Sequence, residues 1–185
     1  MVRKPGWLIG FALLLAACST KSPEPEFELT PATQTGANTG SFRVDGRVWQ
    51  PYGRRCVGYG SCVEEPLKAY YDVRRGKFQI RGFLTTSTRY EDFSLSCDLF
   101  RIGPVSLPPT QFSHPNYGGG LGYAIAALPS DPKYNTFDPT KTTILITRID
   151  TVAKVISGTF EGHLNGTLNI NQSVTITEGR FDVKY

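Results

Sequence analysis

The sequence has few of the residues that most often carry catalytic or metal chemistry. Among its 185 residues are two histidines, His114 and His163, and its only methionine is residue 1. The histidines stand far apart without partners at ligand spacing, and the Cys56–Cys62 spacing is wider than that of the usual zinc pair. We therefore expect no metal site and no cofactor.

The chain also has little net charge. Its formal charge is +4, which falls to +2 if Arg3 and Lys4 are removed with an N-terminal signal. Such a small charge does not favour binding to nucleic acid.

Complete catalytic motifs are absent as well. Residues 58–62 read Gly-Tyr-Gly-Ser-Cys, which is not a nucleophile elbow, and the glycines of residues 118–122 precede a strand rather than a helix. Asp131 and Asp138 are too sparse for a calcium loop, and a proline follows each. A hydrolase that uses His114 with Asp131 or Asp138 is a minor alternative. Our main expectation is a protein that is not an enzyme.

The N-terminus has the layout of a secretory signal. Arg3 and Lys4 supply positive charge, and an apolar segment follows over residues 7–17. This segment is shorter than the roughly 20 residues that a membrane-spanning helix needs. We expect residues 1–17 to be removed as a signal peptide.

The small residues directly before Cys18 resemble the lipobox of bacterial lipoproteins. The resemblance implies that the Cys18 thiol carries diacylglycerol, with palmitate-like chains, and that cleavage occurs before Cys18. Two or three acyl chains suffice for stable membrane binding. Ser19, where a retained lipoprotein would carry Asp, favours the outer membrane by the same resemblance, on either its periplasmic or its surface face. An ordinary signal peptide with an incidental cysteine is the alternative.

Three further cysteines follow the signal. Cys56 and Cys62 bracket a short glycine-containing loop, so a Cys56–Cys62 disulfide is the favoured pairing in an oxidising compartment. Cys97 lies in an apolar strand pattern and is expected to be a buried thiol. Pairing of Cys97 with Cys56 or Cys62 stays open, because spacing alone does not fix connectivity.

Residues 18–40 have little to bury and are predicted to form a disordered tether, with a short strand at 27–29 as the alternative. Residues 41–185 are predicted to form one all-β domain, an antiparallel sandwich or small barrel. Turn signals lie at Asp45-Gly46, at residues 75–76 and at Asn165-Gly166, and apolar residues alternate between them. Gly179 shifts this alternation and predicts a bulge or tight turn.

Residues 103–120 and 129–141 are predicted to be long loops, which often carry function. Aromatic residues and one histidine fall in these and other loops. They make a candidate ligand rim for a protein or glycan partner, although we favour the interpretation that the rings cover the end of the core. The rim comprises Tyr52, Tyr59, Phe112, His114, Tyr117, Tyr134 and Phe137.

Several patterns together resemble one group of proteins. The lipobox, the Pro/Thr-rich tether, the Phe-x-Val-Asp-Gly-x-x-Trp pattern of residues 42–49 and the pattern of residues 146–183 are similar to uncharacterised lipoproteins of the Bacteroidetes type. The resemblance implies an all-β domain on an outer membrane and assigns no site residues. In such bacteria Asp150-Thr151-Val152 also looks like an O-glycosylation tripeptide, whereas the plain interpretation of these residues is a hairpin turn.

These observations favour a membrane-anchored envelope module that binds a partner or has a structural role. The alternative is a lipocalin-like carrier, a barrel that holds a small apolar ligand. Gly158 and Gly162, on the inward face of a predicted strand, would leave room for such a ligand.

Overall fold

The fold is all-β and antiparallel, as the sequence predicts. The computed structural model describes residues 24–57, 60–72, 74, 76–97, 103–105, 120–125, 131–136 and 141–185. These ranges contain strands and no α-helix. The strands are β1 (Thr39–Val44), β2 (Arg47–Trp49), β3 (Arg55–Val57), β4 (Ser61–Val63), β5 (Leu67–Asp72), β6 (Lys77–Thr85), β7 (Tyr90–Cys97), β8 (Gly103–Val105), β9 (Gly120–Ile125), β10 (Lys133–Asn135), β11 (Thr142–Asp150), β12 (Val155–Gly166) and β13 (Ser173–Lys184).

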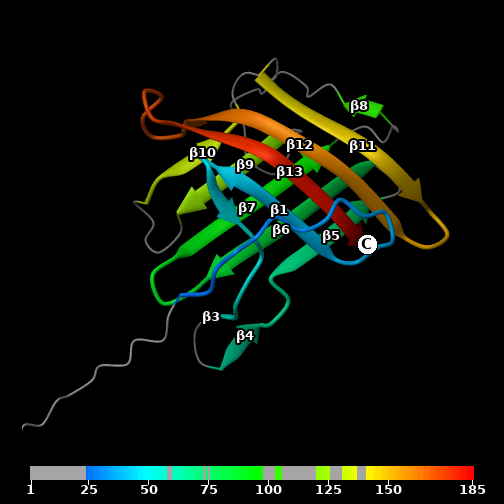
Figure 1. Cartoon of the computed structure of the whole chain (residues 1–185), viewed down its shortest axis with the longest axis horizontal. Coiled ribbons are helices and arrows are strands. Elements are labelled where there is room, and N and C mark those ends of the chain that lie inside the picture. Colours follow the sequence, from blue (N-terminus) through cyan, green and yellow to red (C-terminus); the bar gives the residue numbers. More distant parts are fainter. Residues whose placement is uncertain are drawn as a thin grey trace, which may run out of the picture.

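Eleven of these strands form one sheet, and β3 and β4 form a separate hairpin. The main path runs β2-β1-β13-β12-β10-β9-β7-β6-β5, and β11 pairs with β12 and β8. The sheet curls so that its two halves face each other, which gives a half-barrel (Figure 1). At one end of the curl the ring of Tyr71 meets that of Tyr185 edge-on, with centroids 5.1 Å apart.

The core fills the concave side of this sheet. The fully buried side chains include Phe42, Trp49, Phe78, Leu95 and Ile176. Phe42 stacks on Trp49 with ring centroids 4.8 Å apart, which places the first hairpin of the sheet against the centre of the core. Burial of these large apolar side chains is the main stabilising contribution to the fold.

Local sequence explains two of the turns. Asp45 and Gly46 both have positive φ, 48° and 81°, as a two-residue hairpin turn between β1 and β2 requires. Glu178 has φ 53°, and the register of β13 slips by one residue against both β1 and β12 at this point. The bulge predicted at Gly179 is therefore present.

Three sequence predictions about loops need correction. The short strands β8 and β10 occur inside segments that were predicted to be loops, residues 103–120 and 129–141. The turn predicted at Asn165-Gly166 lies further along the chain, because Gly166 still pairs with Tyr134 in β10. The backbone amide of Gly166 also bonds the carbonyl of Gln172, so residues 167–172 make the turn.

The segment predicted as a disordered tether is largely docked. We call residues 24–38 the strap, because they run along the sheet before β1 begins at Thr39 (Figure 1). Phe27 packs against the core, and its ring contacts that of Tyr52 at 5.4 Å. Thr30 bonds Ser41 through both its amide and its hydroxyl, each at 2.9 Å. Polar contacts rather than apolar burial hold much of this segment, which explains why its composition looked disordered.

Candidate functional site

The structure places two members of the predicted aromatic rim in different environments. Tyr52 is 45% exposed and forms an isolated bridge with Leu84. Tyr134 is buried in β10, and its ring stacks on that of Tyr123 at 6.2 Å. Tyr134 is therefore part of the core and not of a rim. It lies in the strand β10, which directs its side chain into the core, and not in a loop as the sequence predicts. Five rim residues lie outside the described residues: Tyr59, Phe112, His114, Tyr117 and Phe137. Cys18 and Asp138 lie outside them too.

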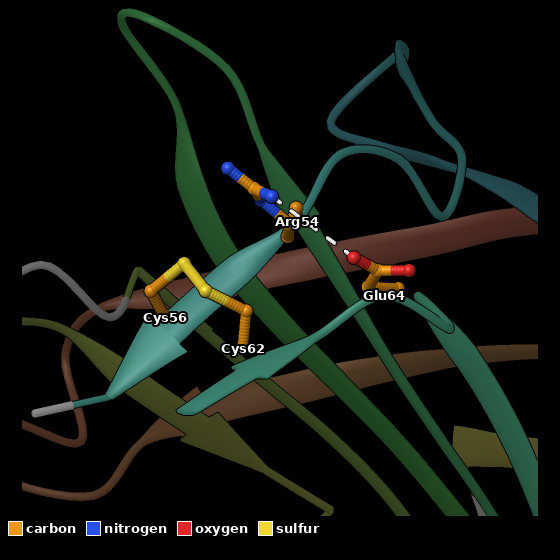
Figure 2. The surroundings of a disulfide bond; sticks show 4 residues. All are labelled: Arg54, Cys56, Cys62 and Glu64. Atoms are coloured by element: carbon orange, nitrogen blue, oxygen red, sulfur yellow. Dashed lines mark ion pairs between the residues drawn. A yellow bond between two sulfur atoms is a disulfide. The ribbon is translucent and has the colours of Figure 1, made fainter. Parts of the chain in front are cut away.

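The small hairpin of β3 and β4 carries the Cys56–Cys62 disulfide that the sequence favoured (Figure 2). The two cysteines face each other directly in the strand pairing. Arg54 and Glu64 flank the two cysteines, and Arg54 Nη1 lies 4.0 Å from Glu64 Oε1. Both side chains are exposed, so this ion pair contributes little to stability. Cys97 is buried in β7 and takes no part in the disulfide.

Arg55 fastens this hairpin to the convex face of the main sheet. Its guanidinium lies over the rings of Phe83 and Tyr90, at 4.7 and 4.2 Å from their centroids. It also donates to Asp92 Oδ1 at 2.5 Å. Stacking and the ion pair together hold the hairpin in one position. A lysine could not take this role, because it lacks the planar guanidinium that stacks on aromatic rings.

Glu91 is a buried carboxylate at one end of the core. Arg89 Nε and Arg47 Nη1 donate to its Oε1 at 2.8 and 2.7 Å, and the hydroxyl of Tyr123 donates to its Oε2 at 2.8 Å. Burial alone would raise the pKa of Glu91, but these hydrogen bonds outweigh burial and hold the pKa below its ordinary value. Burial is the main cause that raises the pKa of Tyr123, and the negative charge of Glu91 raises it further. Glu91 is therefore an ionised structural group.

Asp182 is a second buried carboxylate, and its donors carry no charge. The amides of Gly36 and Thr35 donate to it at 2.8 and 2.9 Å, and the hydroxyls of Thr33 and Ser157 donate at 2.6 and 2.7 Å. Burial acts to raise the pKa of Asp182, yet these hydrogen bonds lower it well below its usual range. The role of this carboxylate is to latch the strap onto β12 and β13.

Neighbouring residues already fill the space beside Gly158 and Gly162, the two glycines that suggest an internal ligand site. A Cβ atom at Gly158 would lie 2.4 Å from the Leu145 carbonyl oxygen and 2.7 Å from the ring of Phe181. At Gly162 it would lie 2.7 Å from the Thr142 hydroxyl. Among the buried rings around Trp49 and Phe93, in the described part of the core, the cavity measures about 10 Å³. That volume is close to the minimum that admits one water molecule.

A shallow groove of about 350 Å³ lies on the convex face, across β6, β7, β9 and β10. Two cross-strand rows of residues build it: Arg81, Ser94, Gly122 and Asn135 in one row, and Asp92, Ala124 and Lys133 in the next. We call this feature the convex groove. A Cβ atom at Gly122 would lie 2.7 Å from Ser94 Oγ and 3.1 Å from Asn135 Oδ1, so only glycine leaves the floor open.

The convex groove has unpaired polar groups at both ends. Within the described residues no hydrogen bond or ion pair engages the side chains of Arg81, Ser94, Lys133 or Asn135. Three strand spacings of about 4.8 Å separate β6 from β10, so Arg81 and Lys133 stand at opposite ends. Asp92, between them, is already neutralised by Arg55. The groove therefore presents two free cations and two free hydrogen-bonding side chains to one ligand.

Sequence analysis did not identify the convex groove. Alternation in β6 does place Arg81 toward water, but Lys133 and Asn135 lie in a segment predicted to be a loop. Their proximity to Ser94 depends on the pairing of β9 with both β7 and β10. No local pattern in the sequence encodes that pairing.

In the part of the chain that the structure describes, no group of three or more histidine, cysteine or carboxylate side chains is placed to hold a metal ion. The same residues include no helix of the length and apolar character needed to span a membrane.

Comparisons with known proteins give no relative. No protein-family model, no curated protein and no solved structure matches this chain.

Proposed function

We propose that this protein is a lipid-anchored binding module of the bacterial cell envelope, held on the outer membrane through Cys18. The order of positive charge, apolar segment, small residues and cysteine supports the anchor. The role is binding rather than catalysis. Among the described residues the two buried carboxylates, Glu91 and Asp182, are saturated by hydrogen bonds and so are poor proton acceptors at neutral pH.

The convex groove is the proposed binding site, and its unpaired cations are the observation that carries the proposal. A free Arg81 and a free Lys133 at opposite ends favour a ligand with negative charge. Ser94, between them, and Asn135, which lies two positions from Lys133 on β10, offer hydrogen bonds to hydroxyl groups. The volume lies at the lower end of the range for small-molecule sites. These features fit one unit of an acidic glycan.

Calorimetric titration of the folded domain with an oligosaccharide of uronic acid tests this proposal. We expect saturable binding, with no binding of a neutral oligosaccharide of similar length. Arg81→Ala and Lys133→Ala should each weaken binding about tenfold, the value of one charge-assisted hydrogen bond. Lys184→Ala, on the far end of β13, is the matched control and should have no effect. Equal affinity in all three variants would refute the site.

The second candidate is the lipocalin-like carrier. The curled antiparallel sheet is compatible with it. The packing of Phe181 against Gly158 weighs against it, because the aromatic ring takes the space that a ligand would need. Increased fluorescence of an apolar dye bound by the native domain would support a carrier instead.

A further inference from the structure

The turn between β12 and β13, residues 167–172, exposes two large aliphatic side chains. Leu168 is 79% exposed and Ile170 is 75% exposed. The turn itself is ordered by hydrogen bonds, because Asn169 accepts from the amides of Gln172 and Asn171. A fixed turn that holds two aliphatic side chains in water, two positions apart, is a candidate contact with an apolar surface. We call residues 167–172 the apolar tip.

The apolar tip lies at the end of the sheet where the chain enters the domain. Glu24, the first described residue, accepts hydrogen bonds from Thr86 and Thr88 in the turn between β6 and β7. From the turn between β6 and β7, neighbouring strands lead step by step across the sheet to the apolar tip. Glu91 pairs with Ile125, and Ala124 pairs with Lys133.

The backbone carbonyl of Lys133 then accepts from the amide of Thr167 at 2.8 Å, which reaches the apolar tip. Figure 1 shows both turns at the left, where the blue strap begins, and the turn between β11 and β12 at the right.

The strap makes this entry point a fixed one. Phe27 packs against Tyr52, and the guanidinium of Arg89 lies 5.5 Å from the centre of its ring. Further along the strap, Asp182 latches residues 33–37. Glu24 stands six positions after Cys18 in the sequence, and a fully extended chain of that length spans about 20 Å. An acyl chain on Cys18 would therefore keep this end of the sheet close to the bilayer.

We infer that the apolar tip inserts Leu168 and Ile170 into the lipid bilayer to which Cys18 is anchored, and so fixes the orientation of the domain. This inference rests on the proposed anchor. Aliphatic side chains enter the boundary between headgroups and acyl chains when a second anchor holds them there. Ile125, 39% exposed and beside the same turns, adds to the surface. In this orientation the turn between β11 and β12 points away from the membrane.

Tryptophan quenching by lipid tests the orientation. The acylated protein, in which Trp49 is buried, is reconstituted into phosphatidylcholine vesicles with bromine on the acyl chains and into unbrominated vesicles. We expect Leu168→Trp and Ile170→Trp each to lose at least about half of the added emission in brominated vesicles. Val152→Trp, at the opposite end and 92% exposed in the parent, is the matched control and should lose none.

The possible failures are distinguishable. Intact mass of the same samples establishes acylation first, and an unmodified Cys18 would overturn both the anchor and the orientation. Acylated protein that shows no quenching at positions 168 and 170, or equal quenching at position 152, would overturn the orientation alone. A photocrosslinker at position 168 that captures an envelope protein and not lipid would overturn it in favour of a protein partner.

Discussion

At the scale of residues, two buried carboxylates are kept ionised in different ways. Glu91 has two arginines and a tyrosine hydroxyl as donors, whereas Asp182 has backbone amides and hydroxyls. Both pKa values are lowered, so both groups stabilise the folded state above the pH at which the unfolded chain titrates. As the pH falls below about 4.5, protonation of these groups removes that contribution.

Glu91→Gln tests this account of the buried network. We expect the free energy of unfolding at pH 7 to fall by about 3 kcal/mol, because Arg89, which is largely buried, loses the charge that compensates its burial, and the half-exposed Arg47 loses its partner. The difference from the parent should shrink toward pH 3, because the unfolded parent takes up a proton on this carboxyl more readily than the folded parent, in which the pKa of Glu91 is lowered. Urea unfolding at both pH values measures this.

The matched control for that substitution is Glu178→Gln. Glu178 pairs with Arg43 at 2.9 Å, but both side chains are well exposed. Removal of such a pair should cost less than about 1 kcal/mol. If Glu91→Gln costs no more than the control at pH 7, the network does not stabilise the fold.

At the scale of elements, the sequence predicts those strands and turns that have strong local signals. The hairpin around Asp45-Gly46 depends on positive φ, for which these residue types are diagnostic. The bulge is predicted by the shift of the apolar alternation at Gly179, and its positive φ falls on the neighbouring Glu178. The three-residue strands β8 and β10 are too short to show alternation, so they were predicted as loops. The convex groove needs the long-range pairing of four strands, and no single stretch of sequence contains that information.

The strap is the element that composition predicts worst. It buries few apolar side chains, so its composition is typical of disorder, yet one carboxylate distant in sequence holds four residues between positions 33 and 37 in place. Its structure is a consequence of tertiary hydrogen bonds to Asp182 rather than of its own sequence. Such docking can be found only when the partner strand is already placed.

Asp182→Asn should release the strap while the sheet stays folded. The substitution keeps the size of the side chain but removes the charge and turns one acceptor into a donor. We expect amide hydrogen exchange at residues 35–37 to accelerate at least about tenfold, with unchanged protection in β6 and β7.

Asp45→Asn is the control, because the Asp45 carboxylate accepts one exposed hydrogen bond, from the amide of Thr175 at 2.8 Å, makes no contact with the strap, and asparagine tolerates its positive φ. Unchanged exchange at residues 35–37 in Asp182→Asn would show that the latch is not what orders the strap.

At the scale of the whole molecule, the domain has two ends and a convex face with separate roles in our account. In the proposed orientation, the end that carries the strap entry and the apolar tip would face the membrane, and the convex groove, which runs across the strands, would stay accessible from the side. The hairpin with the Cys56–Cys62 disulfide lies on that same convex face, held by Arg55. This arrangement depends on the acylation of a single residue.

Metabolic labelling with a radioactive fatty acid tests that claim most directly, in cells that express either the parent chain or Cys18→Ser. Our account predicts that label enters the parent protein, survives extraction of noncovalent lipid, and is lost in the variant. An unlabelled parent protein, or equal label in both, would contradict it.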